Sequence, residues 1–255
     1  MNPTNQTGRV AVVTGGASGM SRSICEHFAR RGDRVGVLDI NGEGATAVAD
    51  ELRAEGAAAI GCAVDVADRA SIEDAIGRVR SELGPVEILV TGAAISKFEL
   101  FTDISVESWQ RVLSVNLTGT FHCIQVAIPD MIAARWGRIV TISSSAGQIG
   151  TPMHAHYAAS KGGVIALTRA LAFDYARMGI TVNNIAPHYI DTPMFRAGIA
   201  ATRSANVATD ADGDRLPVGR LGTGDDIAAC CMYLTSDEAS FITGQLYGVN
   251  GGALP

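Results

Sequence analysis

The chain has 255 residues, a net charge of −6, 47% hydrophobic residues, 18% charged residues and 29 glycines. This composition excludes a disordered chain, a collagen-like chain and a disulfide-dense miniprotein, and the length suits one large α/β domain or two small ones. The acidic balance, without a cluster of basic residues, predicts no nucleic-acid partner. Only two of the 20 basic residues are lysines, Lys97 and Lys161.

The five cysteines form no CxxC pair, and three of them lie in apolar, periodic stretches. Free cysteines in such stretches behave as small hydrophobic residues, so we expect reduced thiols and a cytoplasmic protein. Residues 1–8 are polar and uncharged and lack the apolar segment of a signal peptide. The longest apolar runs have the length of strands, so we predict no membrane-spanning segment.

Short β-rich runs alternate with longer helical patterns along the chain. In chain order, strands are predicted at residues 10–13, 34–40, 58–64, 86–90, 138–143, 180–185 and 245–249. Helices are predicted at residues 19–31, 41–55, 68–83, 105–134, 155–178 and 225–234. The longest of these helices is expected to break or bend near Gly119 and Pro129.

Strands that are unbroken apolar runs, separated by helices, are typical of a parallel sheet covered on both faces. We therefore predict the α/β class and a doubly wound, seven-stranded parallel sheet of the Rossmann type, in one domain over residues 1–255. Residues 196–215 fit no clean period, so a substrate lid is expected at about 189–216. Alternating Asp210, Asp212 and Asp214 lack the following Glu of a calcium loop, and no metal is predicted.

A glycine-rich turn, Thr14–Gly15–Gly16–Ala17–Ser18–Gly19–Met20–Ser21, joins the first strand to the first helix. Glycines there let the backbone approach a pyrophosphate, and the helix start offers unpaired N–H groups. Asp39 ends the second strand, where a carboxylate accepts hydrogen bonds from ribose hydroxyls and repels a 2′-phosphate. The sequence thus predicts a dinucleotide site and favours NAD over NADP, with a solvated strand-end carboxylate as the alternative for Asp39.

Tyr157 and Lys161 lie four residues apart in a helical stretch, so their side chains share a face. A phenol is a poor base at neutral pH, but a nearby ammonium and a cationic nicotinamide favour the phenolate. Tyr157 is therefore a candidate acid/base for a carbonyl/alcohol pair. The fifth strand ends in three serines at positions 143–145, where doubly wound sheets bind their ligands.

From Arg9 to Gly252 the sequence resembles the short-chain dehydrogenase/reductase family. The family's Thr-Gly-x-x-x-Gly-x-Gly turn matches Thr14, Gly15 and Gly19, and its Tyr-x-x-x-Lys pair matches Tyr157 and Lys161. The other matches are Asp65 with Val66, Asn116, Ser144, residues 183–187, Thr192 and a tail from Gly219 to Gly252.

The resemblance implies an NAD(H)-dependent oxidoreductase that interconverts a secondary alcohol and a ketone. It implies that Tyr157 exchanges a proton with the substrate oxygen and that Ser144 orients this oxygen. Lys161 would hold the nicotinamide ribose and lower the pKa of Tyr157, and Asn116 would support a water that links Lys161 to solvent. A homotetramer or homodimer is expected, with the tail in its interface.

The candidate site has three groups of residues. The catalytic residues are Asn116, Ser144, Tyr157 and Lys161. The expected cofactor-binding residues are Gly15, Ser18, Gly19, Met20, Ser21, Asp39, Ile40, Asp65, Val66, Ala93, Tyr157, Lys161, Pro187, Ile190 and Thr192. The expected substrate pocket contains Ser145, Ala146, His154, His188, Tyr189, Met194 and Phe195.

The sequence departs from the family pattern at three places. Ser21 replaces the third turn glycine, where an added side chain should crowd the cofactor and weaken or reshape its binding; alternatively, its hydroxyl donates to a phosphate. Residues 91–94, Thr-Gly-Ala-Ala, replace Asn-Asn-Ala-Gly, so the strand must be capped differently, with Thr91 able to form a hydrogen bond. His188 replaces the glycine after Pro187 and should project toward the nicotinamide and substrate.

The substrate is expected to be a small or mid-sized apolar ketone or secondary alcohol. His154 and His156 flank Tyr157 and are either solvated residues at the helix start or pocket residues. The alternatives are a 3-oxoacyl thioester reductase, a hydroxysteroid dehydrogenase, or a dinucleotide-binding sensor without catalysis. Retention of all four catalytic residues argues against the sensor.

Overall fold

The structure, a computed structural model, describes residues 8–204, 214 and 216–254. Its described part contains a seven-stranded parallel sheet in the order β3-β2-β1-β4-β5-β6-β7. The order reverses between β1 and β4, so the predicted doubly wound Rossmann fold is confirmed. The strands are β1 Val10–Thr14, β2 Arg34–Asp39, β3 Ala59–Ala63, β4 Ile88–Thr91, β5 Gly137–Ile142, β6 Ile180–Pro187 and β7 Leu246–Val249.

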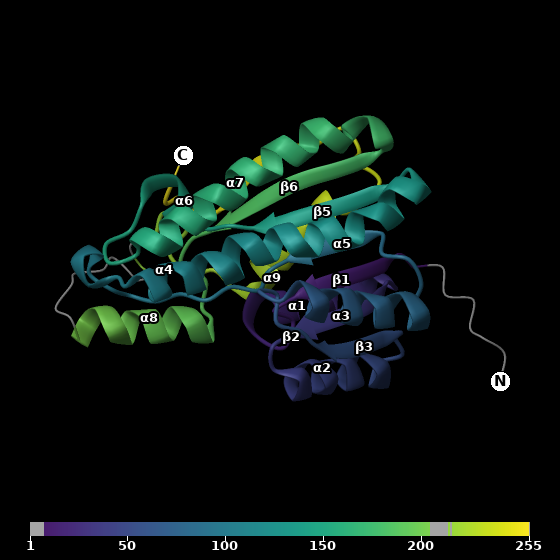
Figure 1. The fold of residues 1–255 in the computed structure, drawn as a ribbon, viewed down its shortest axis with the longest axis horizontal. Helices are drawn as coiled ribbons and strands as arrows, with labels where there is room; N and C mark the ends of the chain where they lie inside the picture. The colour runs from purple at the N-terminus through teal and green to yellow at the C-terminus, as the bar shows by residue number, and fades with distance from the viewer. Residues whose placement is uncertain (1–7, 205–213, 215, 255) are drawn as a thin grey trace.

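Helices cover both faces of the sheet (Figure 1). One face packs against α1 (Gly19–Arg31), α2 (Gly42–Ala54) and α9 (Gly224–Leu234). The other packs against α3 (Arg69–Glu82), α5 (Gly119–Ala134) and α7 (Ala155–Tyr175). The remaining elements are α4 Val106–Leu113, α6 Ala146–Ile149, α8 Pro193–Ser204, the 3₁₀ turns η1 Phe101–Asp103 and η3 Ala176–Met178, and the π-helical turn η2 Ser114–Thr118.

Successive side chains of the central strand, β1, pack into two hydrophobic cores, one on each face of the sheet. Val10 and Val12 pack with α3 and α5, whereas Ala11 and Val13 pack with α1, α2 and α9. This alternation follows from the period of two along a strand. Because both faces are apolar, the strand reads as a continuous hydrophobic run rather than an alternating one.

The predicted helix at residues 105–134 forms one continuous run of helical turns that contains a π-helical segment. The π-helical turn η2 at residues 114–118 separates α4 from α5 and ends directly before Gly119, one of the two predicted positions. The other predicted position, Pro129, lies inside α5. A π-helical turn within a long helix is frequent at functional sites. The region Val106–Ala134 is long and apolar enough to span a membrane, but 56% of its most apolar window is buried inside the fold.

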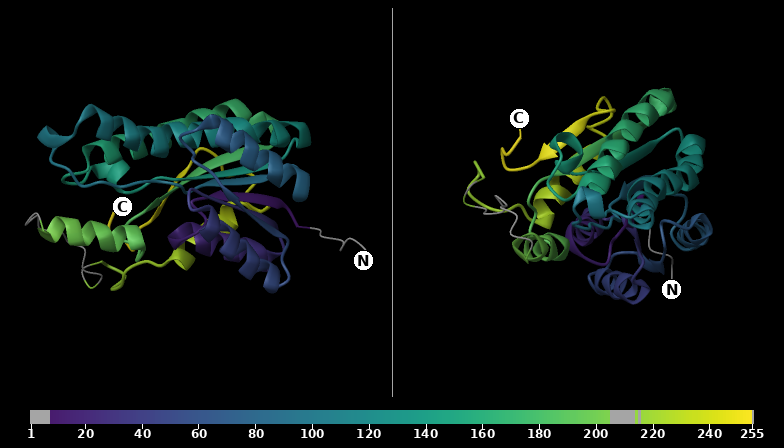
Figure 2. Two further views of the ribbon diagram at one scale, coloured as in Figure 1. Left: turned by 60° about the horizontal axis from the view of Figure 1, so that its bottom comes forward. Right: turned by 60° about the vertical axis from the view of Figure 1, so that its left-hand side comes forward.

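The expected irregular segment at residues 196–215 begins as a helix. Helix α8 lies at the end of the molecule away from the N-terminus (Figure 2, left) and starts at Pro193, whose fixed φ suits the first helical position. Thr192 accepts a hydrogen bond from the Phe195 N–H at 3.2 Å and caps it. Residues 205–213 and 215 of the expected lid, including Asp210 and Asp212, lie outside the described residues.

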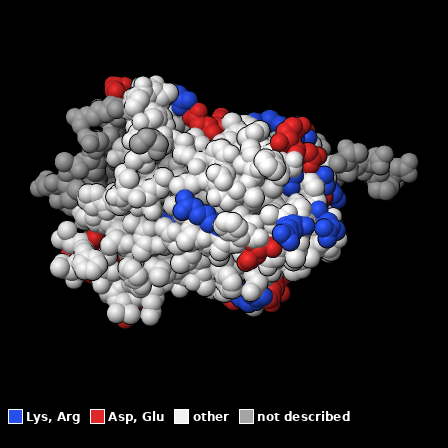
Figure 3. All heavy atoms as spheres, turned by 90° about the horizontal axis from the view of Figure 1, so that it is seen from above, with Lys and Arg blue, Asp and Glu red and all other residues white. Residues whose placement is uncertain are grey.

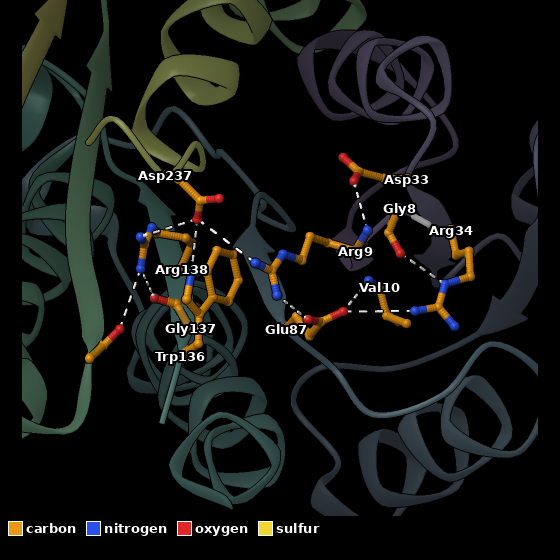
Figure 4. A network of polar contacts seen from close by, with 11 residues as sticks. Gly8, Arg9, Val10, Asp33, Arg34, Glu87, Trp136, Gly137, Arg138 and Asp237 are labelled. Carbon is orange, nitrogen blue, oxygen red and sulfur yellow. Dashed lines mark hydrogen bonds and ion pairs between the residues drawn. The ribbon is translucent and has the colours of Figure 1, made fainter. Parts of the chain in front are cut away.

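The amino ends of the strands carry a network of paired charges (Figure 4). Glu87 binds Arg9 at 2.7 Å and accepts from the Val10 N–H at 3.0 Å. The guanidinium groups of Arg9 and Arg138 lie 3.9 and 4.4 Å from the centre of a Trp136 ring. These contacts fix the edge of the sheet that is opposite the cleft described next.

Candidate active site

A cleft opens at the carboxyl ends of β1, β2 and β4, where doubly wound sheets bind ligands. Most of the residues expected to bind a cofactor line it, namely Gly15, Ser18, Gly19, Met20, Ser21, Asp39, Ile40, Asp65, Val66, Ala93 and Thr192. Met194, expected in the substrate pocket, also lines it, whereas Tyr157, Lys161, Pro187 and Ile190 lie outside its wall.

The glycine-rich turn presents the start of α1 to the cleft. Gly15 and Gly19 have φ angles of +74° and +57°, which glycine adopts without strain. The N-cap residue Ser18 makes no capping hydrogen bond with its side chain, and the first turn contains no acidic residue. The first N–H groups of α1 therefore remain available to an anion, which fits the pyrophosphate of a dinucleotide.

Backbone N–H groups hold the carboxylate of Asp39 in the cleft. Its Oδ2 accepts from the Ala17 N–H at 3.1 Å, and its Oδ1 accepts from the Asn41 N–H at 2.9 Å. These bonds join the end of β2 to the glycine-rich turn. They place a fixed negative group in the cleft beside the exposed Ile40.

A positive side chain that the sequence did not suggest also borders the cleft. Arg111, on α4, lines it and pairs with Asp65 at 3.7 Å. Asp65 also accepts from the Ala67 N–H at 2.9 Å. No motif marks Arg111, because its pairing depends on how α4 packs beside the end of β3.

The Ser21 side chain fits against the end of β4 because position 92 is a glycine. A Cβ built on Gly92 would lie only 2.2 Å from Ser21 Oγ, so the Ser21 side chain occupies space that a larger residue 92 would need. Both residues line the cleft. The two departures from the family pattern therefore compensate each other sterically, and the effect of Ser21 on cofactor affinity stays a prediction.

The end of β4 is capped by Thr14 rather than by Thr91. The N–H groups of Gly92 and Ala93 both donate to Thr14 Oγ1 at 3.1 Å. Thr91 Oγ1 is buried without a hydrogen-bond partner. The hydrogen bond anticipated for Thr91 is therefore not formed.

Ser144, Tyr157 and Lys161 converge beside the cleft. Desolvation raises the pKa of Tyr157 above its usual value, and the neighbouring Ser144 hydroxyl lowers it by a smaller amount. Burial lowers the pKa of Lys161 to about 8, and Lys161 Nζ donates to the Ile142 carbonyl at 2.9 Å. The expected lowering of the Tyr157 pKa by Lys161 stays a prediction.

Asn116 lies in the π-helical turn η2 and is fully buried. Its Oδ1 accepts from the Ile95 N–H at 2.8 Å, and its Nδ2 donates to the Ile95 carbonyl at 3.0 Å and to Ser160 Oγ at 3.1 Å. The side chain therefore joins the segment after β4 to α7. Its expected role toward a water beside Lys161 stays a prediction.

Several residues expected in the substrate pocket belong to two groups of packed rings. The His154 ring stacks on Tyr157 at 4.8 Å and contacts Phe98 at 3.8 Å. The His188 ring stacks on Tyr189 at 3.8 Å, and Tyr189 contacts Phe195 at 5.5 Å. Burial lowers the pKa of His154 to about 4, so this imidazole is neutral at physiological pH.

Both histidines beside Tyr157 are buried, so neither is a solvated residue at the helix start. The neighbouring serines are also engaged. Ser145 Oγ lies 2.7 Å from His188 Nδ1, and Ser96 Oγ lies 2.8 Å from His154 Nε2. Ala146 donates its N–H to Ser144 Oγ at 3.2 Å, which joins Ser144 to the start of α6.

This fold and these side chains define an α/β oxidoreductase with a dinucleotide cleft and a Ser-Tyr-Lys site. The family profile described as short chain dehydrogenase matches residues 9–202. The chain therefore belongs to the short-chain dehydrogenase family, and it is an oxidoreductase that acts on alcohol and ketone groups with a nicotinamide dinucleotide.

Several characterised proteins are similar over nearly the whole chain. The 3-oxoacyl-[acyl-carrier-protein] reductase of Escherichia coli is 39% identical over 248 residues, covering 97% of this chain and 98% of that protein. The cis-4-hydroxycyclohexanecarboxylate dehydrogenase of Sinomonas cyclohexanicum is 39% identical, with 96% of each chain covered. The D-threitol dehydrogenase of Mycolicibacterium smegmatis is 36% identical, with 96% and 92% covered.

Proposed function

We propose that this protein is an NAD-dependent dehydrogenase of secondary alcohols that also reduces the corresponding ketones. The observation that carries the proposal is the convergence of three side chains: the Ser144 hydroxyl lies close enough to Tyr157 to lower its pKa, and the buried Lys161 Nζ lies 5.7 Å from the centre of the Tyr157 ring. These groups supply a proton carrier, an oxygen-binding hydroxyl and a cation beside one cleft.

In the oxidation direction, the Tyr157 phenolate oxygen accepts the proton of the substrate hydroxyl while Ser144 holds the same oxygen by a hydrogen bond. A bound nicotinamide supplies the acceptor for the hydride that leaves the carbinol carbon. In the reverse direction the Tyr157 phenol returns the proton to the carbonyl oxygen. The raised pKa of Tyr157 favours the phenol that ketone reduction requires.

The fixed carboxylate of Asp39 supports NAD rather than NADP. Its two backbone hydrogen bonds hold it where the ribose hydroxyls of the adenosine half would bind. Arg111 is already paired with Asp65. A 2′-phosphate at Asp39 would therefore meet a carboxylate of like charge.

The aromatic rings of Phe98, His154, Tyr189 and Phe195 support an apolar substrate. A 3-oxoacyl thioester is the second candidate, because the reductase of that name from Escherichia coli is 39% identical to this chain. Recognition of an acidic carrier would use free basic side chains, but Arg196 on α8 binds Asp191 through two bonds of 2.7 and 2.9 Å. This pairing favours the small ketone or alcohol.

The test is the change in nicotinamide absorbance with a substrate panel, run separately with NAD and NADP. The panel contains 2-butanol, cyclohexanol, cis-4-hydroxycyclohexanecarboxylate, D-threitol, a hydroxysteroid and acetoacetyl-CoA with the matching ketones. We expect turnover of small alcohols with NAD and at least tenfold lower kcat/KM with NADP. Dinucleotide binding without turnover of any member would instead support the sensor, and a preference for acetoacetyl-CoA would support the thioester reductase.

We also propose a homotetramer or homodimer in the cytoplasm. Phe173 on α7 and Phe241 after α9 are 87% and 101% exposed. The face along α7, seen from above in Figure 3, carries few charges except near its end beside the N-terminus. Light scattering should give a mass above that of one chain, and Phe173→Glu should reduce it; a monomeric wild-type protein would contradict this proposal.

A further inference from the structure

Two segments that are far apart in the sequence meet at the start of α7. Residues 96–99 follow β4, and residues 153–157 lead into the helix that carries Tyr157. The Glu99 N–H donates to the Met153 carbonyl at 2.9 Å. Met153 has a φ of +61°, a left-handed conformation that is unfavourable for its side chain and is held here by its surroundings.

The Glu99 carboxylate collects donors from three directions and is only 18% exposed. Ser108 Oγ on α4 donates to it, Lys97 Nζ lies 2.9 Å from it, and His156 Nε2 lies 3.2 Å from it. Ser108 and then Lys97 hold the pKa of Glu99 below its usual value. Glu99 is therefore an ionised group that only accepts hydrogen bonds.

His156 joins this carboxylate to the backbone of Tyr157. Its side chain is fully buried, and its Nδ1 accepts a hydrogen bond from the Tyr157 N–H at 3.0 Å. A backbone N–H only donates, so Nδ1 carries no proton. Nε2 then carries the proton and donates to Glu99, which fixes both the tautomer and the orientation of the ring.

This arrangement holds both backbone polar groups of Tyr157. The N-cap residue of α7, His154, makes no capping hydrogen bond with its side chain, so His156 satisfies the Tyr157 N–H in its place. On the other side, the Tyr157 carbonyl accepts from Ser160 Oγ at 2.7 Å, and Ser160 is bound by Asn116. His156 thus holds the N–H of Tyr157, and Asn116 acts on its carbonyl through Ser160.

We propose that Glu99 and His156 are positioning residues that fix Tyr157 against Ser144. Neither residue needs to touch the substrate, because they act through the backbone of Tyr157. Lys97 contributes by its ion pair with Glu99. The proposal rests on the proposed role of Tyr157 as the proton carrier.

Four variants separate the two hydrogen bonds. Glu99→Gln keeps an acceptor for His156, whereas Glu99→Ala removes it. His156→Asn keeps an acceptor in the place of Nδ1, whereas His156→Gln keeps a donor in the place of Nε2 and loses the bond to the Tyr157 N–H. Asp68→Ala is the matched control, because it removes the N-cap of α3 and contacts neither Glu99 nor Ser108.

The first measurement is kcat with NADH and the fastest ketone of the panel above. Glu99→Ala and His156→Gln should lower kcat at least tenfold while the Kd of NADH stays within twofold. Glu99→Gln should keep kcat within about threefold of the wild-type value. Asp68→Ala should lower only the Tm. Unchanged kcat in Glu99→Ala and His156→Gln, or an equal loss of kcat in Asp68→Ala, would overturn the proposal.

The second measurement needs no turnover and therefore separates this proposal from the proposed function. Hydrogen exchange of the Tyr157 amide should accelerate at least tenfold in His156→Gln and Glu99→Ala. If Tyr157 moves away from Ser144 in these variants, the pKa of its phenol should also rise in a spectroscopic titration, because the neighbouring Ser144 hydroxyl lowers that pKa. A wild-type protein inactive on the whole panel refutes the proposed function, whereas unchanged exchange and titration refute the positioning pair.

Discussion

Replacing Gly92 by alanine tests whether Ser21 and Gly92 form one packing unit under the dinucleotide cleft. The new Cβ would lie 2.2 Å from Ser21 Oγ and 3.0 Å from the Thr14 carbonyl oxygen. Ordinary contacts are near 3.5 Å or longer, so the overlap with Ser21 exceeds one ångström. The Thr14 oxygen belongs to the backbone of β1 and moves little.

Overpacking of this kind costs about 1–3 kcal/mol of folding free energy. Ser21 relieves part of the overlap by changing its rotamer, so we expect Gly92→Ala to destabilise the protein by about 1–2 kcal/mol. The displaced hydroxyl faces the cleft, and a similar loss in binding would weaken NADH by roughly tenfold. In a Ser21→Gly background the same substitution meets only the Thr14 oxygen and should cost about 1 kcal/mol less.

The assay is a double-mutant cycle measured by urea unfolding, with the Kd of NADH as a second readout. A coupling free energy of about 1 kcal/mol between positions 21 and 92 supports the compensation. Additive effects within about 0.5 kcal/mol would refute it. Ser21→Gly alone also tests the prediction that Ser21 weakens or reshapes cofactor binding, since unchanged or weaker NAD affinity would contradict it.

Three further variants test the site and the frame around it. Tyr157→Phe should lower kcat by about 10²–10⁴-fold with NADH binding retained, as measured by absorbance and fluorescence. Lys161→Met should abolish a rise in stability with pH. The unfolded chain keeps the Lys161 proton up to about pH 10.5, whereas the folded protein keeps it only up to about pH 8. The free energy of unfolding of the wild-type protein, measured with urea, should therefore increase by up to about 3 kcal/mol between these two pH values. Glu87→Gln weakens the binding of Arg9 at the amino ends of the strands and should destabilise the fold by about 1–2 kcal/mol. The kcat should stay unchanged, because the cleft lies at the carboxyl ends. A lowered kcat would show that the two edges of the sheet are not independent.

The sheet was predictable because its signals are local. Each strand is a continuous apolar run, and the glycine-rich turn and the Tyr157–Lys161 pair have fixed spacings within single elements. Helix α8 was missed because its composition is rich in alanine and lacks a clear period. The Thr192–Pro193 pair, an N-cap followed by a first-position proline, was the available signal for its start.

Pairings across the fold were not predictable from one sequence. Glu99 and His156 are 57 residues apart, and nothing near either residue points to the other. Arg111 and Asp65 meet through the packing of α4, and Ser21 fits only because Gly92 lies against it. Each of these pairings depends on side-chain directions that are set when the helices and strands pack together. The spacing of the residues along the chain therefore does not predict them.

Our proposals connect both lysines of this arginine-rich chain to Tyr157, Lys161 directly and Lys97 through Glu99, but the two lysines lie in different surroundings. Lys161 is nearly fully buried, donates to one carbonyl and lies 5.7 Å from the centre of the Tyr157 ring. A guanidinium there would bring five donors and more volume into a space with few acceptors, whereas an ammonium is compact and its pKa responds to burial. Lys97 is exposed and binds Glu99 as a simple point charge, a contact that arginine could also make. Lysine therefore suits position 161, where the charged group must be compact and where burial lowers its pKa to about 8.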